Sequence, residues 1–361
     1  MSTAPQNVTG EVGTLAAPDA VPDHQQEKQR ALRRLRELTC GYWISQCIAV
    51  AAELGIADLV KAGPKNIEEL AKSTGTKPAL IYRMMRALAS CGIFAEGPDH
   101  CFALTPMAEL LENTPNSLRC WAILLGRDDF HRAWDALSHT LATGEPAFKH
   151  VLGMSYYDYL TGNPKAAAIF NDGLTAYTSQ VAEAVVAAYD FSVIRNLVDV
   201  GAGHGVLASA ILKANPELRA VLFDLPHARE GATRTLTAAG VAHRAEVVAG
   251  DFFRAVPEGG DAYLLSHVIH NWSDEGALAI LGNCRRAMAP SAKLFLVEAV
   301  IPPGNEPFFG KLLDVHMMVA AEQGMDRTRD EYRALLEKAG FRLTRVVPTA
   351  SDVSVIEGVP M

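Results

Sequence analysis

Residues 196–205, "NLVDVGAGHG", join an apolar run to a glycine-rich turn, and this stretch decides the fold. The run Leu197–Val200 is typical of a strand that is buried on both faces of a sheet. The segment "VLASAILKANP" (206–216) follows the glycines and predicts a helix that ends before Pro216. A strand, a glycine turn and a helix in this order predict the first unit of a parallel sheet, which binds its ligand at the carboxyl ends of its strands.

Apolar strands and helices go on alternating beyond this unit. Helical stretches such as "GALAILGNCRRAM" (276–288) predict a parallel sheet that is covered on both faces. The last stretch, residues 341–360, has two strands with no helix between them and predicts a hairpin that adds an antiparallel strand. The fold class is therefore α/β, with a Rossmann-like domain over residues 191–361. The other predicted strands lie in "RAVLFDLP" (219–226), "AEVVAGDFF" (245–253), "DAYLLSHVI" (261–269) and "AKLFLVEAV" (292–300).

The glycine spacing indicates which ligand this sheet binds. The dinucleotide fingerprint GxGxxG needs a glycine at position 206, where this chain has valine. Gly201, Gly203 and the glycine at 205 form GxGxG, the usual mark of an S-adenosylmethionine loop, which needs small residues and free N–H groups at a helix start. Asp224, 23 residues past Gly201, ends the second strand, where a carboxylate accepts ribose hydroxyls. Asp251 and Phe252 end the third strand and offer an acceptor and an apolar wall to an adenine.

The bulk composition limits the classes of protein to which the chain can belong. Its 361 residues, 49% hydrophobic with net charge −8, predict two domains and disfavour nucleic acid as a partner. Its apolar stretches are shorter than the ~18 residues that span a membrane, so no membrane partner is expected. Six cysteines without paired spacing predict free thiols in a cytoplasmic protein. Residues 1–24 lack a basic start and an apolar run, and we expect a disordered tail there rather than a signal peptide.

The front third of the chain predicts a helical dimerisation domain over residues 25–115. Residues 26–62 carry apolar side chains on more than one helical face, which favours a buried homodimer interface over an ordinary core helix. Helices at 67–73 and 78–90, followed by two short strands around Gly97, form a winged-helix pattern, which often binds DNA. Residues 61–112 hold six Lys or Arg and six Asp or Glu, and because this balance leaves no basic face we predict a structural winged helix.

The helical linker, residues 116–190, is dense in aromatic side chains. Aromatic residues at helical spacing are usually core, but this density between two domains also suits a pocket for a flat, apolar ligand. The sequence leaves both interpretations open.

Two histidines, His267 and His270, stand three residues apart in "SHVIHNWSDE" (266–275). The spacing alone allows a metal pair, a structural pair or a catalytic base with a neighbour. No nearby pair of cysteines or acids completes a tetrahedral ligand set, so we predict no metal site here. Ser273 with Asp274 and Glu275 predicts a helix N-cap with acids in the first turn.

With these features, the chain resembles the plant-type O-methyltransferase family, in particular its bacterial branch that acts on secondary metabolites. The resemblance covers residues 27–361, and it implies a winged-helix dimerisation domain, a Rossmann-like methyltransferase domain, a homodimer, and methyl transfer to an aromatic hydroxyl. The motifs that carry it are "AAELGIADLV", "LVDVGAGHG", "LFDLP", "GDFF", "HVIHNWSDE", "LVEAVIP" and "MDRTRDEYRALLEKAGF".

The resemblance also implies roles for particular residues. His270 would be the general base and His267 its bystander, with Glu298 and Asp326 holding the imidazole. Residues expected to contact the cofactor are Gly201, Asp224, Leu225, Asp251, Phe252 and Ser266. Residues expected to contact the substrate are Asn271, His316 and Met317.

Three positions depart from the family pattern. Asn271 replaces the commoner aspartate, Ser266 replaces the lysine of plant members, and Asp326 stands where a glutamate is usual. Some family members use the same fold and cofactor for hydroxylation or decarboxylation, so a tailoring enzyme of that kind is the alternative function. The presence of His270 favours methyl transfer.

Overall fold

The computed structural model describes residues 24–114, 117–321 and 324–361. The described residues from His24 to Ile44 belong to one unit, and the described residues from Ser45 to Met361 belong to a second. The expected disordered tail, residues 1–24, lies outside the described residues except for its last position. The described helices include none whose length and hydrophobicity would let it span a bilayer.

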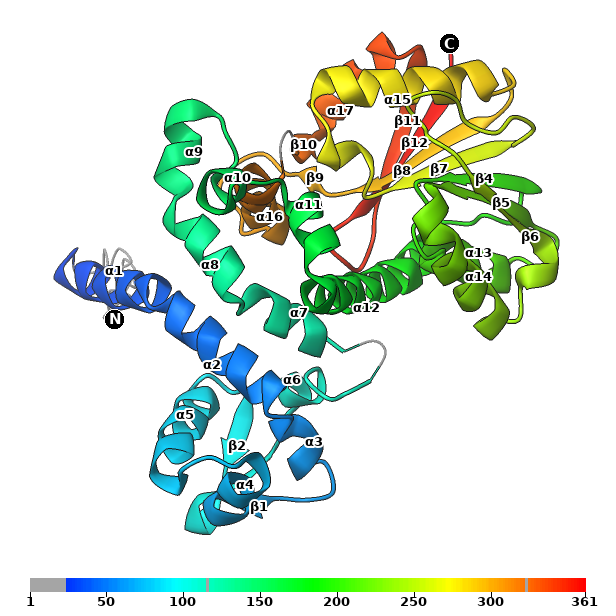
Figure 1. Cartoon of the computed structure of the whole chain (residues 1–361). Helices are drawn as coiled ribbons and strands as arrows, with labels where there is room; N and C mark the ends of the chain where they lie inside the picture. The colour runs from blue at the N-terminus through cyan, green and yellow to red at the C-terminus, as the bar shows by residue number, and fades with distance from the viewer. Residues whose placement is uncertain (1–23, 115–116, 322–323) are drawn as a thin grey trace, which may run out of the picture. The chain divides into compact units, whose positions relative to one another are not determined.

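A seven-stranded sheet organises the C-terminal half (Figure 1). Five adjacent strands, from β8 to the edge strand β6, are parallel, and β12 pairs antiparallel with both β8 and β11, which confirms the predicted closing hairpin. In spatial order the strands are β11 (Phe341–Pro348), β12 (Ser354–Pro360), β8 (Lys293–Glu298), β7 (Ala262–Ser266), β4 (Asn196–Val200), β5 (Arg219–Asp224) and β6 (Ala245–Ala249).

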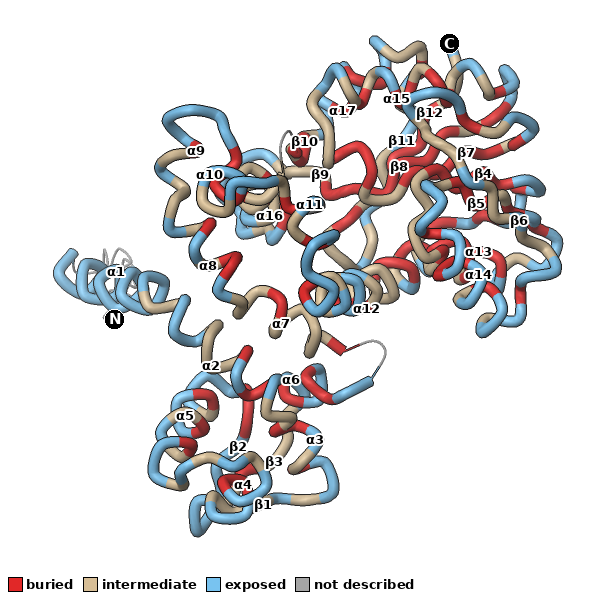
Figure 2. Tube along the Cα trace, in the orientation of Figure 1, coloured by how far each residue is buried: buried red, intermediate tan, exposed pale blue. Residues whose placement is uncertain are grey.

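Helices cover both faces of this sheet, because side chains that alternate along each strand point to opposite faces. Figure 2 shows burial concentrated in the inner strands β4, β7 and β8, whereas the edge strands β6 and β11 are mostly exposed or intermediate. On one face, Leu197 and Leu264 pack with α12 (Pro164–Ala188), α13 (Val206–Ala214) and α14 (Arg229–Ala238). On the other face, Val198 and Leu265 pack with α15 (Asp274–Ala287) and α17 (Arg329–Lys338). The predicted α/β class with a covered parallel sheet is confirmed.

A small winged-helix unit precedes the sheet. The helices α3 (Ile56–Val60), α4 (Ile67–Thr74) and α5 (Pro78–Ser90) pack on strands β1 (Lys65–Asn66), β3 (Cys101–Leu104) and β2 (Phe94–Glu96). Asn66 begins α4 through a capping box with Glu69, since each side chain accepts a hydrogen bond from the other's backbone N–H. The predicted helices at 67–73 and 78–90 and the two strands around Gly97 are therefore confirmed.

The first two helices expose apolar side chains in the single chain. The helix α1 (His24–Thr39) has no buried residue, and Leu32, Leu35 and Leu38 are more than half exposed. The helix α2 (Gly41–Glu53) begins with exposed Tyr42 and Trp43.

The middle of the chain is a run of short helices, three of which contact α16 (Phe309–Ala320) from the far end of the chain. Phe130, Phe148 and Tyr156 are buried in the core of this region together with Val319 of α16. Core packing therefore accounts for these aromatic residues, whereas Trp134 is only partly buried. The short helices are α6 (Pro106–Glu109), α7 (Arg119–Leu125), α8 (Asp128–Asp135), α9 (Leu137–Thr143), α10 (Ala147–Leu152) and α11 (Tyr156–Gly162).

Candidate active site

The glycine loop lies between β4 and α13, at the carboxyl end of the sheet. Gly201, Gly203 and Gly205 have φ of 76°, 53° and 71°, a region that favours glycine. Space is a second constraint, because a Cβ on Gly201 would lie 2.6 Å from Val268 Cγ2 and one on Gly205 would lie 2.4 Å from Leu222 Cδ2. The loop thus packs closely against the Val268 and Leu222 side chains, and glycine is needed there for both conformation and space.

Asp224 closes this loop from the end of β5. Its Oδ2 accepts a hydrogen bond from the Gly203 N–H at 2.7 Å, and its Oδ1 accepts one from the Leu225 N–H at 2.6 Å. A small pocket opens between these residues and the end of β6, and it is lined by Gly203, Asp224, Leu225, Val248 and Ala249 among others. The predicted cofactor residues of the first two strands therefore lie together.

The remaining predicted cofactor residues line the next two strand ends. Asp251 follows β6 and accepts a hydrogen bond from the Phe253 N–H at 2.9 Å. The ring of Phe252 lies against the glycine loop, since a Cβ on Gly201 would be 3.7 Å from its Cε1. Ser266 ends β7, and its Oγ lies 3.2 Å from His267 Nδ1.

His270 is buried between two carboxylates. It lies on the single helical turn η4 (Ile269–Asn271) that follows β7 and is 8% exposed. Its Nδ1 is 3.4 Å from Asp326 Oδ1 and 3.8 Å from Glu298 Oε2. Fold contacts thus bring together three side chains that lie 28 or more positions apart in the sequence.

Glu298, at the end of β8, does two things in this cluster. Its Oε1 accepts hydrogen bonds from the Val268 and Ile269 N–H groups at 3.1 and 2.9 Å, which holds the turn that carries His270. Its Oε2 is buried and makes no hydrogen bond. This oxygen lies near the imidazole and interacts with it electrostatically. Complete burial raises the pKa of Glu298 to about 7, although the His270 charge acts in the opposite direction.

The two carboxylates also control the charge of His270. Burial lowers the pKa of this imidazole, but the charges of Glu298 and Asp326 and the Asp326 hydrogen bond outweigh burial, and the pKa is raised. A carboxylate on Nδ1 leaves Nε2 as the nitrogen that can exchange a proton with another molecule.

His267 has a different environment. Burial, assisted by the His270 charge, lowers its pKa to about 3, so the ring is neutral. Its backbone is left-handed, with φ of 52°, and this turns the chain so that the next two N–H groups reach Glu298. Its ring lies edge to face with Tyr177 at 5.3 Å and with His270 at 5.4 Å.

Arg327 is a site residue that sequence reasoning missed. Its side chain is fully buried, donates to the Ile269 and Trp272 carbonyls at 3.3 and 3.0 Å, and pairs with Asp274 at 2.9 Å. The guanidinium therefore clamps both ends of the turn that carries His270. The signal was an arginine directly after the acid in "MDRT", but arginine in a loop is ordinarily exposed.

Asp199 is the second residue that was missed. It is buried in β4, and burial followed by the Asp224 charge raises its pKa to about 7. A lone acid inside the apolar run "NLVDV" was the signal for it.

The predicted substrate residues lie on two elements. Asn271 donates from Nδ2 to the His267 carbonyl at 2.8 Å and so stabilises the turn. On α16, His316 Nδ1 accepts a hydrogen bond from the Trp134 indole at 3.2 Å, and burial lowers the pKa of His316 to about 4. Met317 is buried near the His270 backbone, because both Met317 Cε and the His270 carbonyl lie within 3.1 Å of a Cβ placed on Gly324.

The comparisons with known proteins agree with this geometry. The O-methyltransferase domain family matches residues 134–342, and the O-methyltransferase dimerisation domain matches residues 36–114. The chain belongs to the O-methyltransferase family. The matched dimerisation domain supports a homodimer.

Individual members of the O-methyltransferase family are similar over nearly the whole chain. The phenazine O-methyltransferase PhzM of Lysobacter antibioticus is 48% identical, covering 91% of this chain and 96% of the relative. The 3-amino-4-hydroxybenzoate 4-O-methyltransferase of Streptomyces cremeus is 42% identical, covering 91% and 89%. The crystal structure of CalO1, a methyltransferase in calicheamicin biosynthesis, was solved in its SAH-bound form. It superposes with a TM-score of 0.84 at 34% identity, and the match covers 94% of this chain and 99% of CalO1.

Proposed function

We propose that the protein transfers a methyl group from S-adenosylmethionine to the hydroxyl of a small aromatic secondary metabolite, with His270 as the general base. The observation that carries this proposal is the buried imidazole between Glu298 and Asp326, which stands one strand away from the glycine loop. A base that is fixed beside a methyl-donor site is the arrangement that methyl transfer to a weakly acidic hydroxyl requires.

The residues at the strand ends fit the methyl donor. A Cβ on Gly201 would clash with Val268 Cγ2 at 2.6 Å, whereas Gly203 borders open space and favours glycine through its φ of 53°. The open side of this loop would admit the amino-acid end of the cofactor. Asp224 would accept the ribose hydroxyls, Asp251 would accept from the adenine amine, and Phe252 would cover the adenine ring. Leu225 and Ser266 border the same site. When bound, the cofactor supplies an electrophilic methyl group on a sulfonium.

The chain's own residues supply the proton transfer. A phenol has a pKa near 10 and is mostly protonated at neutral pH. Neutral His270 takes this proton through Nε2, while Asp326 holds Nδ1 and both carboxylates stabilise the imidazolium that forms. Alignment of the acceptor oxygen with the methyl group would contribute much of the remaining acceleration.

The acceptor would lie between the His270 turn and α16. Asn271, His316 and Met317 remain our proposed substrate residues. Because the Trp134 indole can only donate, His316 carries its proton on Nε2 and would donate to an acceptor atom of the substrate.

Binding and turnover test this proposal together. Calorimetry on the full chain should show micromolar binding of S-adenosylmethionine and no binding of NAD. Mass spectrometry should then find a product that is about 14 Da heavier than the acceptor when hydroxyphenazines and aminohydroxybenzoates are offered. NAD binding without S-adenosylmethionine binding would overturn the glycine-loop argument, and a hydroxylated or decarboxylated product would favour the alternative reaction.

Three further points stay predictions. The domain boundaries at 25–115, 116–190 and 191–361 would be checked by limited proteolysis. The absence of nucleic-acid and membrane partners follows from composition alone. The cytoplasmic location is inferred from cysteine spacing.

A further inference from the structure

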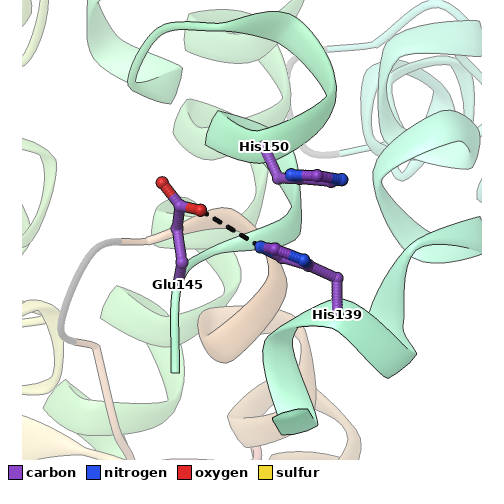
Figure 3. Close-up of side chains that lie close together, drawn as sticks. All are labelled: His139, Glu145 and His150. Atoms are coloured by element: carbon purple, nitrogen blue, oxygen red, sulfur yellow. Dashed lines mark hydrogen bonds and ion pairs between the residues drawn. The ribbon is translucent and has the colours of Figure 1, made fainter. Parts of the chain in front are cut away.

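We propose that His139, Glu145 and His150 form a binding site for Zn²⁺ or a similar transition-metal ion, outside the methyl-transfer site. One ligand atom from each side chain lies within 4.8 Å of the other two. His139 Nε2 is 3.1 Å from Glu145 Oε2, and the two imidazoles stack at 3.6 Å with an angle of 15° between their planes. Figure 3 shows the two rings stacked one above the other, with the Glu145 carboxylate hydrogen-bonded to His139.

The local fold holds the three side chains in place. Gly144, with φ of 76°, ends α9 and donates to the Thr140 carbonyl at 2.8 Å. The Thr143 hydroxyl donates to the His139 carbonyl at 2.9 Å and accepts from the Glu145 N–H at 3.1 Å. Pro146 then begins α10, which carries His150. The ligands therefore stand on two helices and the tight turn between them.

The donor set selects the class of metal. Two imidazoles and one carboxylate are a set that Zn²⁺ uses when a fourth position is left to water. Mg²⁺ and Ca²⁺ prefer sets made of oxygen alone, so imidazoles disfavour them. Because an imidazole lone pair lies in the ring plane, the two stacked rings would have to turn out of their parallel arrangement for both to bind one ion. His139 is partly exposed and Glu145 and His150 are exposed, so an ion can enter from solvent.

Metal binding here would join two helices that support the proposed substrate pocket. Both α9 and α10 contact α16, which carries His316 and Met317. An ion held by His139 on α9 and His150 on α10 would fix the corner between them. We therefore expect the ion to raise the thermal stability of the helical region.

The test uses the full-length protein, freed of metal with a chelator, and ZnCl₂ as the probe. Calorimetry should find one Zn²⁺ per chain, and His139→Ala and His150→Ala should each weaken binding by roughly tenfold or more. Glu145→Gln keeps the size of the side chain and removes its charge, and it should weaken binding less. Co²⁺ should give a tetrahedral absorption spectrum in the native protein and lose it in both histidine variants.

Two control variants exclude other histidine sites. His100 makes an exposed pair with Glu96 at 3.0 Å that matches the His139–Glu145 pair but lacks a second histidine, so His100→Ala should bind Zn²⁺ normally. His270→Ala removes the other described cluster of suitable geometry and should also bind normally. Unchanged binding in His139→Ala and His150→Ala, or loss of binding in His270→Ala, would overturn the proposal. Circular dichroism of each variant checks that it is folded.

Discussion

His270 and its neighbour His267 have the same side chain but opposite surroundings. Two carboxylates beside its Nδ1 raise the pKa of His270, whereas burial lowers the pKa of His267 to about 3. A base must exchange its proton near neutral pH, which suits the first residue and not the second. The difference comes from Glu298 and Asp326, which approach His270 alone.

Replacing His270 tests the base directly. With a phenolic acceptor, His270→Ala should lower kcat by roughly 10²–10⁴, the usual contribution of a general base. Cofactor affinity should change little, because the proposed cofactor residues lie on other strand ends. His267→Asn is the matched control, since asparagine tolerates the left-handed backbone at this position. Equal turnover in the two variants would show that His270 is not the base.

The carboxylates of Glu298 and Asp326 should determine how kcat/KM depends on pH. Only the neutral imidazole accepts a proton, so kcat/KM should rise as pH passes the raised pKa of His270 and level off above it. Asp326→Asn removes the negative charge that stabilises the protonated imidazole of His270. The pKa of His270 should therefore fall, and the acidic limb of the kcat/KM profile should move to lower pH. Initial rates between pH 5 and about 10 measure this, with the exposed Asp330→Asn as control. An acidic limb that stays in place would contradict the assigned partner.

At the scale of the element, the turn after β7 depends on groups from three other elements. Glu298 of β8 holds two of its N–H groups, and Arg327 of β10 (Arg327–Thr328) holds two of its carbonyls. Asp326 is itself held by α16, because the Asp314 carboxylate accepts from the Asp326 N–H at 2.9 Å. The base is therefore positioned by long-range contacts rather than by its own helical turn.

Removing the arginine clamp should destabilise this arrangement. Arg327→Leu leaves the Ile269 and Trp272 carbonyls without their donor, and an unsatisfied buried acceptor typically costs about 1–3 kcal/mol. The Asp274 side chain is 56% exposed and can be solvated instead, so we expect a total loss of about 3 kcal/mol. Guanidinium unfolding measures the change, and Arg333→Ala, which breaks only an exposed pair with Asp330, should stay within about 0.5 kcal/mol. If the free energy of unfolding of Arg327→Leu equals that of the unmodified protein, the arginine clamp contributes little to stability.

At the scale of the whole molecule, the apolar surface of α1 and α2 needs a partner. Leu35 and Trp43 are each about two-thirds exposed in the single chain, at 65% and 67%. Apolar side chains clustered on one segment typically mark an interface between proteins. The match of residues 36–114 to the dimerisation domain supports a second copy of this chain as that partner.

Truncation locates the dimer interface. Deletion of residues 1–24 should leave a dimer, because that segment has no apolar run. Deletion of residues 1–60 removes α1 and α2, together with α3 of the winged-helix core, and should give monomeric or insoluble protein. Light scattering coupled to gel filtration measures the mass of each. A soluble dimer that lacks residues 1–60 would place the interface elsewhere.

The sequence by itself determined the features that depend on neighbouring residues. The alternation of apolar strands and helices, the glycine loop before α13 and the closing hairpin were all predicted, because periodicity, glycine conformation and turn residues act over a few positions. The family motifs also pointed to His270, Glu298 and Asp326 as one group before any distance was known.

Only the tertiary structure decided how these groups meet. Glu298 and Asp326 reach one imidazole because the ends of β7, β8 and β10 come together, and no local pattern encodes that distance. The buried Arg327 clamp, the left-handed His267 and the opposite pKa shifts of the two histidines follow from desolvation and packing. Such effects depend on residues far apart in the chain, because burial and electrostatic attraction act through space rather than along the sequence.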